Sequence, residues 1–219
     1  MGGRAAGPVV AVARAALAKP SVEVARRLLG AVLVSTIGGA EVAVRLTEVE
    51  AYEGTEDPAS HAFRGETARN GVMFGPAGHL YCYFTYGMHW CANVVCERVG
   101  RASAVLLRAG EVVRGVDTAR SRRPAARAAR DLARGPARLA SCLALSRETN
   151  GVDLCNPRSP VQLESLGPPG ARVSVGPRVG IAVATTRPWR FWLDGDASVS
   201  AFRPGGRKRL APDRQTDAS

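Results

Sequence analysis

Residues 46–61 read LTEVEAYEGTEDPASH, and this stretch joins an extended apolar segment to acidic, aromatic and imidazole side chains. Side chains of an extended segment alternate between two faces, so Val42, Val44 and Leu46 are expected to share a side with Glu48 and Glu50. Two carboxylates would thus continue an apolar face. A buried, unpaired charge is costly or shifts its pKa, so these carboxylates need a cation, hydrogen-bond donors or a water-filled pocket.

The residues after Glu50 add further chemistry to the same strand end. Tyr52 follows at once, and His61 comes after a turn-like segment at residues 54–58. We therefore expect an acid or base, an aromatic ring and an imidazole to lie close together there.

A second stretch, HLYCYFTYGMHWCANVV at residues 79–95, holds the other three tyrosines, Tyr81, Tyr83 and Tyr86. Only 5% of the chain is aromatic, so this concentration of rings points to a function. A flat cavity lined by rings suits a flat ligand.

The ordered motifs of these stretches resemble the alkyladenine (3-methyladenine) DNA glycosylase family. The resemblance extends with few gaps from Arg26 to Ser200. The residues that carry it are Glu50-Ala51-Tyr52, His61, Arg69-Asn70, Met73-Phe74, Tyr81-x-Tyr83-x-x-Tyr86-Gly87-Met88, Asn93 and Leu106-Leu107-Arg108. The chain differs from the family pattern at His89, at Arg138 where a lysine is expected, and in residues 62–68, which are one residue shorter.

The resemblance implies a catalytic pair. Glu50 matches the water-activating carboxylate, and Arg108 matches the arginine that helps to hold the same water. The implied reaction breaks an N-glycosidic bond in DNA and leaves an abasic site, with water rather than a lysine amine as the nucleophile. The only lysines, Lys19 and Lys208, lie outside the motifs. The alternative is that Glu50 and Arg108 form a structural ion pair.

The resemblance also implies a pocket for a base rotated out of the DNA stack. Tyr52, His61 and Tyr83 match the residues that sandwich this base. Asn93 matches the residue that disfavours the 2-amino group of guanine, and Val179 falls in the segment whose backbone lines the pocket. The alternative for the rings is ordinary core packing.

A further set of residues is expected to contact DNA outside the pocket. By the resemblance, Tyr86 is the wedge that fills the gap left in the duplex, with Met88 beside it. The alternative is a turn tyrosine that covers the core. Arg69 and Arg138 are expected at the DNA backbone.

Composition agrees with a nucleic-acid partner. The net charge of +11 and the isoelectric point near 10.4 favour a polyanion over an acidic small molecule. Five cysteines without a C-x-x-C pair indicate neither a disulfide framework nor a zinc site. We expect no metal and no cofactor, and double-stranded DNA with damaged purines as the partner.

The chain is expected to form one α+β domain, with a curved, partly open barrel-like antiparallel sheet flanked by helices. Residues 1–18 are predicted to be a loose N-terminus, residues 19–202 the glycosylase domain, and residues 203–219 a disordered basic tail. The apolar run near the start is too short to cross a bilayer, so we expect no membrane association. A cytoplasmic, nucleoid-associated monomer is the corresponding expectation.

Local patterns predict individual elements. A helix is expected at residues 21–29, a hairpin turn at 37–40, a long loop at 54–78, strands at 80–84 and 90–95, and a strand from Arg101 that ends in Arg108. Residues 118–145 are expected to form two helices, with Pro124 near a first position and Gly135-Pro136 between them. Five arginines would then line one helical face, either as a DNA contact or as a solvated basic side: Arg123, Arg127, Arg130, Arg134 and Arg138.

Two other functions remain open from the residues alone. One is a noncatalytic nucleic-acid binding module that uses the same basic surface and wedge. The other is a hydrolase of free nucleosides or a formyl-transfer domain of related shape. The carboxylate at Glu50 counts against the first, because binding phosphates gains nothing from it. The positive charge and Tyr86 count against the second.

Overall fold

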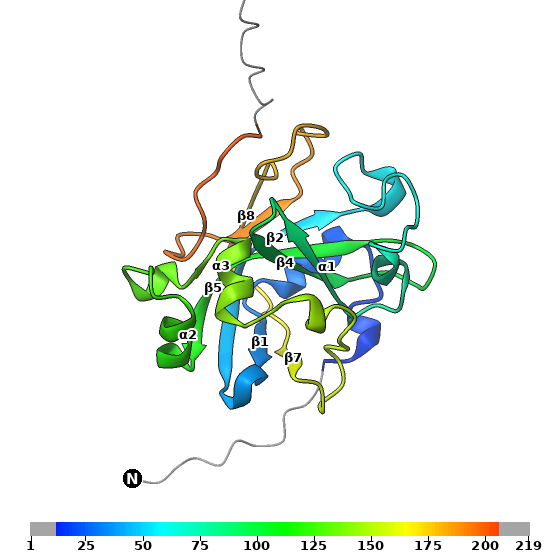
Figure 1. Ribbon diagram of the computed structural model, residues 1–219. Coiled ribbons are helices and arrows are strands. Elements are labelled where there is room, and N and C mark those ends of the chain that lie inside the picture. Colours follow the sequence, from blue (N-terminus) through cyan, green and yellow to red (C-terminus); the bar gives the residue numbers. More distant parts are fainter. Residues whose placement is uncertain (1–11, 206–219) are drawn as a thin grey trace, which may run out of the picture.

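A curled antiparallel sheet occupies the centre of the molecule, and short helices lie at its flanks (Figure 1). The computed structural model describes residues 12–205. The path of neighbouring strands is β3-β4-β5-β2-β1-β7, while β6 pairs with β5, and β9 pairs with both β2 and β8. The single α+β domain with a half-barrel sheet confirms the predicted fold class.

The elements have the following bounds. The strands are β1 (Val32–Ser35), β2 (Val42–Tyr52), β3 (Leu80–Thr85), β4 (His89–Val95), β5 (Ala104–Arg114), β6 (Ala133–Arg134), β7 (Val161–Ser165), β8 (Val173–Gly176) and β9 (Arg190–Leu193). The α-helices are α1 (Ser21–Leu28), α2 (Val116–Arg122) and α3 (Pro136–Cys142). Single 3₁₀ turns are η1 (Arg14–Ala16), η2 (Ile37–Gly39), η3 (Gly54–Glu56), η4 (Gly71–Phe74), η5 (Ala129–Asp131) and η6 (Arg147–Thr149).

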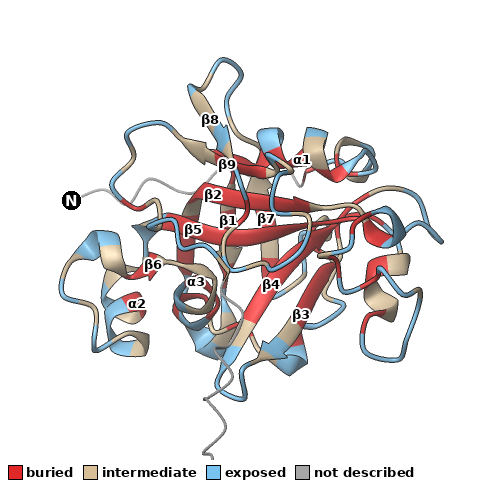
Figure 2. Ribbon diagram, turned by 90° about the horizontal axis from the view of Figure 1, so that it is seen from above, coloured by how far each residue is buried: buried red, intermediate tan, exposed pale blue. Residues whose placement is uncertain are grey.

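Strand β2 is the element from which the sheet branches. One edge of β2 pairs with β5 along most of its length. Its other edge pairs with β1 at residues 42–45 and with β9 at residues 48–50. The second half of β2 is therefore bonded on both sides and is buried, as is most of β5 (Figure 2).

The pairing of β2 with β5 is irregular near Thr47 and Arg108, and this corrects the predicted face of the two carboxylates. Register shifts lie on either side of the Glu48–Ala109 pair. A bulge changes which side chains face the core. Beyond it, Val49 and Ala51 join the main core with Leu46. Glu48 and Glu50 therefore do not continue the apolar face of Val42, Val44 and Leu46, as the simple alternation predicted.

A glycine permits the close approach at this irregularity. A Cβ atom at Gly110 would lie 2.3 Å from Val44 Cγ1 and 2.6 Å from the Arg45 carbonyl oxygen. A side chain there would force β2 and β5 apart. Gly110 therefore lets the two strands that carry Glu50 and Arg108 stay in contact where their register changes.

Two apolar clusters hold the domain together. The main core lies between the sheet and its helices, with α3 packed on β4 and β5, and α1 packed on β2. A smaller cluster joins Ala62 and Met73 of the long 54–78 loop to Tyr81, Val95 and Ala104 of the sheet. The smaller cluster fixes the loop that carries His61 against the strands that carry the tyrosines.

The hairpins agree with the sequence predictions. Gly38 and Gly39, with φ of 76° and 77°, form the turn between β1 and β2. Strands β3 and β4 pair in register around the return at Tyr86-Gly87-Met88. Helix α1 starts at Ser21, as predicted, and ends at Leu28. The Ser21 backbone N–H and hydroxyl both donate to Glu53 Oε1, at 2.7 and 2.6 Å.

Two predicted elements are wrong. Strand β5 does not end in Arg108 but continues to Arg114. The arginine-rich helix at residues 123–134 is absent, since α2 ends at Arg122 just before Pro124, and residues 133–134 pair with β5 as β6. Proline disfavours a helical residue before it, and pairing with β5 buries Leu132 and Ala133. The five arginines therefore do not share a helical face. Gly135-Pro136 does begin a helix, α3.

The predicted loose N-terminus and basic tail lie largely outside the described residues, which exclude 1–11 and 206–219. Within residues 12–18, Leu17 is buried and Arg14 forms an ion pair with Asp153, with a closest N–O distance of 2.7 Å. This part of the segment packs on the domain. No helix among residues 12–205 has the length and apolar character needed to cross a bilayer.

Candidate active site

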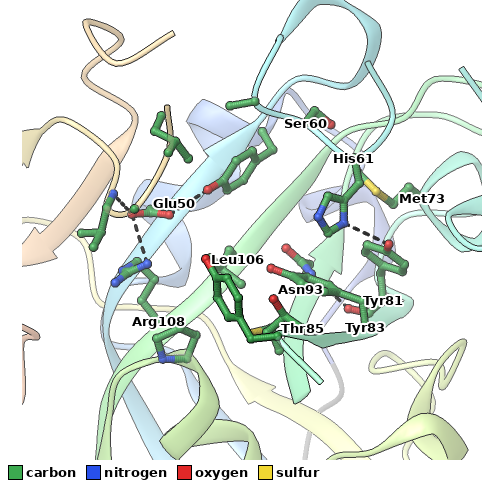
Figure 3. Close-up of a pocket in the computed structure, with 18 residues that line it drawn as sticks. Glu50, Ser60, His61, Met73, Tyr81, Tyr83, Thr85, Asn93, Leu106 and Arg108 are labelled. Carbon is green, nitrogen blue, oxygen red and sulfur yellow. Dashed lines mark hydrogen bonds and ion pairs between the residues drawn. The ribbon is translucent and has the colours of Figure 1, made fainter. Parts of the chain in front are cut away.

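Glu50 is the buried acid of the site. Its side chain has no exposed surface, yet it borders a cavity of about 260 Å³ (Figure 3). The backbone N–H of Val179 donates to Oε1 at 2.7 Å, and the Tyr52 hydroxyl donates to Oε2 at 2.9 Å. Arg108 Nη1 lies 3.3 Å from Oε1. These three groups orient the carboxylate toward the cavity.

Arg108 joins Glu50 to a second buried carboxylate, Glu48. Arg108 Nε donates to Glu48 Oε1 at 2.9 Å, and Arg190 Nε donates to the same oxygen at 2.7 Å. The Ser200 backbone N–H donates to Glu48 Oε2 at 2.7 Å. Glu48, Arg190 and Ser200 were not predicted as site residues. Glu48 had one signal in the sequence, its position two residues before Glu50. Arg190 and Ser200 had none.

The environments of the two carboxylates shift their pKa values in opposite directions. Burial raises the pKa of Glu50 and outweighs the opposing effects of Arg108, the Val179 N–H and the Tyr52 hydroxyl, while the charge of Glu48 raises it further. Burial also acts on Glu48, but Arg108, Ser200 and Arg190 together lower its pKa. Glu50 is therefore the stronger base of the two carboxylates.

Aromatic side chains form the other side of the cavity. Figure 3 shows His61, Tyr81 and Tyr83 across the cavity from Glu50 and Arg108. The centroid of the His61 ring lies 4.4 Å from that of Tyr83, with the planes at 77°. His61 Nδ1 lies 3.2 Å from the Tyr81 hydroxyl. The predicted pocket residues Tyr52, His61 and Tyr83 are therefore brought together, and Tyr81 adds a ring that was not assigned.

Asn93 and Val179 also line this cavity. Asn93 is buried on β4, and its Nδ2 donates to the Tyr81 carbonyl oxygen at 3.1 Å. Its amide is therefore fixed by the strand that carries the rings. The Val179 backbone N–H also donates the hydrogen bond to Glu50, a contact that the sequence did not indicate.

An ion pair that the sequence did not indicate fixes the Val179 segment. Arg178 and Asp57 are both completely buried, and Arg178 Nη2 donates to Asp57 Oδ1 at 2.8 Å. Arg178 also donates to the Ala51 carbonyl oxygen at 3.0 Å, and its guanidinium carbon lies 4.5 Å from the centroid of the Tyr52 ring. The pair thereby connects the loop of His61, the end of β2 and the segment that holds Glu50.

The predicted DNA-contact residues occupy different places. Tyr86 borders the cavity and is 84% exposed at the tip of the β3–β4 hairpin, where it adopts a left-handed φ of 52°. Met88 is 69% exposed and borders a separate hollow, which Arg138 also lines. Arg69 Nη2 donates to the Phe84 carbonyl oxygen at 3.1 Å beside the same hairpin. Only Tyr86 of this set reaches the pocket.

Metal ligands do not gather anywhere in the part of the chain that the structure describes. Residues 12–205 contain no group of three or more histidine, cysteine, aspartate or glutamate side chains that could hold an ion. The cavity offers carboxylate, guanidinium, amide and aromatic groups. These groups suit hydrogen bonding to a flat, polar ring and proton transfer by a carboxylate.

The fold and site together define a class, which is a single-domain α+β protein with a buried carboxylate, paired with an arginine, at the wall of an aromatic pocket. A family model described as methylpurine-DNA glycosylase (MPG) matches residues 15–197. The chain therefore belongs to the methylpurine-DNA glycosylase family, which confirms the resemblance seen in the sequence. It is a DNA glycosylase, a hydrolase of DNA repair, and DNA is its substrate. The noncatalytic alternative is thereby excluded.

Several bacterial relatives have similar sequences over almost their whole length, and each carries the name "Putative 3-methyladenine DNA glycosylase". The protein from Streptomyces avermitilis is 54% identical over 189 residues, which cover 85% of this chain and 89% of that protein. The Nocardia farcinica protein is 51% identical, covering 86% and 92% of the two chains. The Burkholderia cenocepacia HI2424 protein is 44% identical, covering 90% and 94%.

Proposed function

We propose that this enzyme removes alkylated or deaminated purines from duplex DNA by hydrolysis of the N-glycosidic bond, with Glu50 as the base that activates water. The observation that carries the proposal is the buried Glu50 carboxylate, held by Arg108 at the edge of a ring-lined cavity. The candidate substrates are 3-methyladenine, 7-methylguanine, hypoxanthine and ethenoadenine. The product is free base and an abasic site.

The base must leave the helical stack before it reaches this cavity. Rotation costs a few kcal/mol, and least at weakened or mismatched pairs. Stacking on an aromatic side chain contributes about 1 to 3 kcal/mol per base, which offsets that cost. Tyr52, His61 and Tyr83 are the proposed stacking partners, because all three line the cavity. Asn93 would disfavour the 2-amino group of an undamaged guanine.

Glu50 would act at two points of the reaction. The transition state of glycosidic cleavage has positive charge on the sugar, and an ionised carboxylate stabilises it. The same carboxylate accepts a proton from the water that attacks the sugar carbon, a contribution of about 10² to 10⁴ in rate. Arg108 would hold that water against Glu50. The raised pKa of Glu50 fits a base, because a stronger base takes the proton more readily.

Tyr86 is the proposed wedge. Its exposed ring stands beside the cavity mouth and would fill the space left by the rotated base, which bends the DNA. Met88 would lie in the groove next to it, and Arg69 and Arg138 would contact phosphates. A single site of this kind acts on one lesion at a time, so a monomer suffices.

Base release separates this proposal from DNA binding. Duplexes that carry each candidate lesion are incubated with the native protein and with Glu50→Gln, and free base and DNA affinity are both measured. We expect Glu50→Gln to lose base release by about 10² or more while it still binds the lesion duplex. Release at the native rate by a folded Glu50→Gln variant would contradict the role of Glu50.

A further inference from the structure

Glu48 is completely buried yet does not line the cavity. Its Oε1 accepts hydrogen bonds from Arg108, Arg190 and the Ser200 hydroxyl, at 2.9, 2.7 and 3.0 Å. Its Oε2 accepts the Ser200 backbone N–H at 2.7 Å. Such full pairing anchors a charge in one place. Glu48 is thus a fixed negative charge close to the proposed base.

Arg108 is shared unequally between the two carboxylates. Its Nε lies 2.9 Å from Glu48, a normal charge-assisted hydrogen bond, whereas its Nη1 lies 3.3 Å from Glu50. The guanidinium is therefore held more closely by Glu48. Arg190 Nε also bonds to Glu48 but has no ion pair with Glu50 among the described residues.

We propose that Glu48, anchored by Arg190 and Ser200, is a positioning residue that restrains Arg108 from closer pairing with Glu50, and so leaves the Glu50 carboxylate able to take a proton from water. This inference rests on the proposed role of Glu50 as the base. Two glutamates and two arginines make a neutral cluster. Both arginines pair with Glu48, however, and Arg108 pairs less closely with Glu50, so the Glu50 carboxylate at the cavity is the less neutralised of the two.

The other groups that face Glu50 do not explain why Glu50 is less neutralised than Glu48. Tyr52 of the same strand and the Val179 N–H donate to Glu50 and lower its pKa, as Arg108 of β5 does. Tyr83 of β3 faces it as a neutral phenol, since burial raises the pKa of Tyr83 well above the usual range. Glu48 is the nearby charge that raises the pKa of Glu50, in addition to burial.

The sign of each substitution follows from these contacts. Glu48→Gln removes the neighbouring negative charge and lets Arg108 pair more closely with Glu50. Both effects lower the pKa of Glu50, so the acid limb of the pH–rate profile should move to lower pH, by about one unit. The plateau rate should fall, because a weaker base accelerates the reaction less. Arg190→Gln leaves Arg108 as the arginine that pairs with Glu48, so Arg108 should be held farther from Glu50 and the limb should move to higher pH.

The test is the pH dependence of single-turnover release of 3-methyladenine from DNA treated with a methylating agent. Glu48→Gln and Arg190→Gln are compared with the native enzyme. Arg190→Lys keeps the charge and should leave the limb in place. Glu111→Gln alters an exposed ion pair with Arg45 and should leave the whole profile unchanged. Circular dichroism establishes that each variant is folded.

Opposite shifts for Glu48→Gln and Arg190→Gln support the proposal. If Glu48→Gln does not fold, a shift to higher pH in Arg190→Gln, absent from Arg190→Lys, supports it alone. An equal loss of rate at every pH in a folded variant, or a shift of the wrong sign, would overturn it. If Glu50→Gln is inactive but the acid limb does not move in Glu48→Gln or Arg190→Gln, only this inference fails. If Glu50→Gln retains release, the proposed base itself is wrong.

Discussion

The two sides of the cavity are built in contrasting ways. On the carboxylate wall, Glu50 and Arg108 line the cavity, and Glu48 and Arg190 lie behind them. This wall is almost entirely buried, and the two glutamates have no exposed surface. The hairpin tip, residues 85–89, is open to solvent, with Tyr86 84% exposed. The proposed base needs a fixed position, whereas the proposed wedge needs a free surface from which to enter DNA.

The contrast also predicts how each side responds to substitution. In the wall, the loss of one member leaves a buried charge without a partner, which is strongly destabilising. At the tip, the side chains make few contacts inside the protein, so their loss should affect DNA rather than folding. Substitutions on both sides, measured for stability and for binding, can therefore separate the two behaviours.

The largest effect on stability is expected at the buried ion pair of Asp57 and Arg178, which supports the carboxylate wall. Asp57→Asn removes the charge that pairs with the buried Arg178, so the free energy of unfolding in urea should fall by about 3 to 5 kcal/mol. The exposed control Glu111→Gln should change it by less than about 1 kcal/mol. Equal effects for the two variants would show that the buried side has no special sensitivity.

An intermediate effect is expected at the tip. Tyr86→Ala should weaken binding to a lesion duplex by about 1 to 3 kcal/mol, because the stacked ring is lost, while the melting temperature stays unchanged. Val99→Ala is a matched control, since Val99 is also an exposed apolar side chain but lies outside the cavity. If Tyr86→Ala lowered the melting temperature and bound DNA normally, the ring would be a cover for the core instead of a wedge.

The smallest effect is expected at His61, which packs against Tyr81 and Tyr83 on the aromatic side of the cavity. Burial and the nearby Arg69 lower the pKa of His61. Between the two pKa values the folded protein binds fewer protons than the unfolded chain. The free energy of unfolding should therefore fall as the pH drops from the unfolded pKa of His61 through its folded pKa. Arg69→Gln should raise the pKa of His61 in an NMR titration and reduce that acid sensitivity. An unchanged titration would show that Arg69 does not act on this ring.

Much of the tip could be predicted from the sequence, because local chemistry determines it. Alternating rings on either side of Tyr86-Gly87-Met88 indicate two strands and a tight return, and the structure has both. Glu50, Tyr52 and His61 were likewise expected to gather because they are close in the chain, and they line one cavity.

The wall could not be predicted to the same extent. The irregular pairing at Thr47 and Arg108 changes which face Glu50 occupies, and its cause is the fit between two strands rather than a local pattern. Arg178 and Arg190 reach the site from more than a hundred residues away. The spacing of arginines near Arg127 fitted a helix, but pairing with β5 and the position of Pro124 overrode that local signal.

The distance along the chain between the partners of Glu48 has a consequence for the newly made protein. Glu48 and Ser200 are separated by 152 residues, and Glu50 and Val179 by 129. Contacts of such long range form late, because the intervening chain must first be ordered. On the ribosome, the acidic centre cannot be completed until residue 200 has emerged from the exit tunnel. A nascent chain that already displays its aromatic hairpin would therefore be unable to cut bases from DNA.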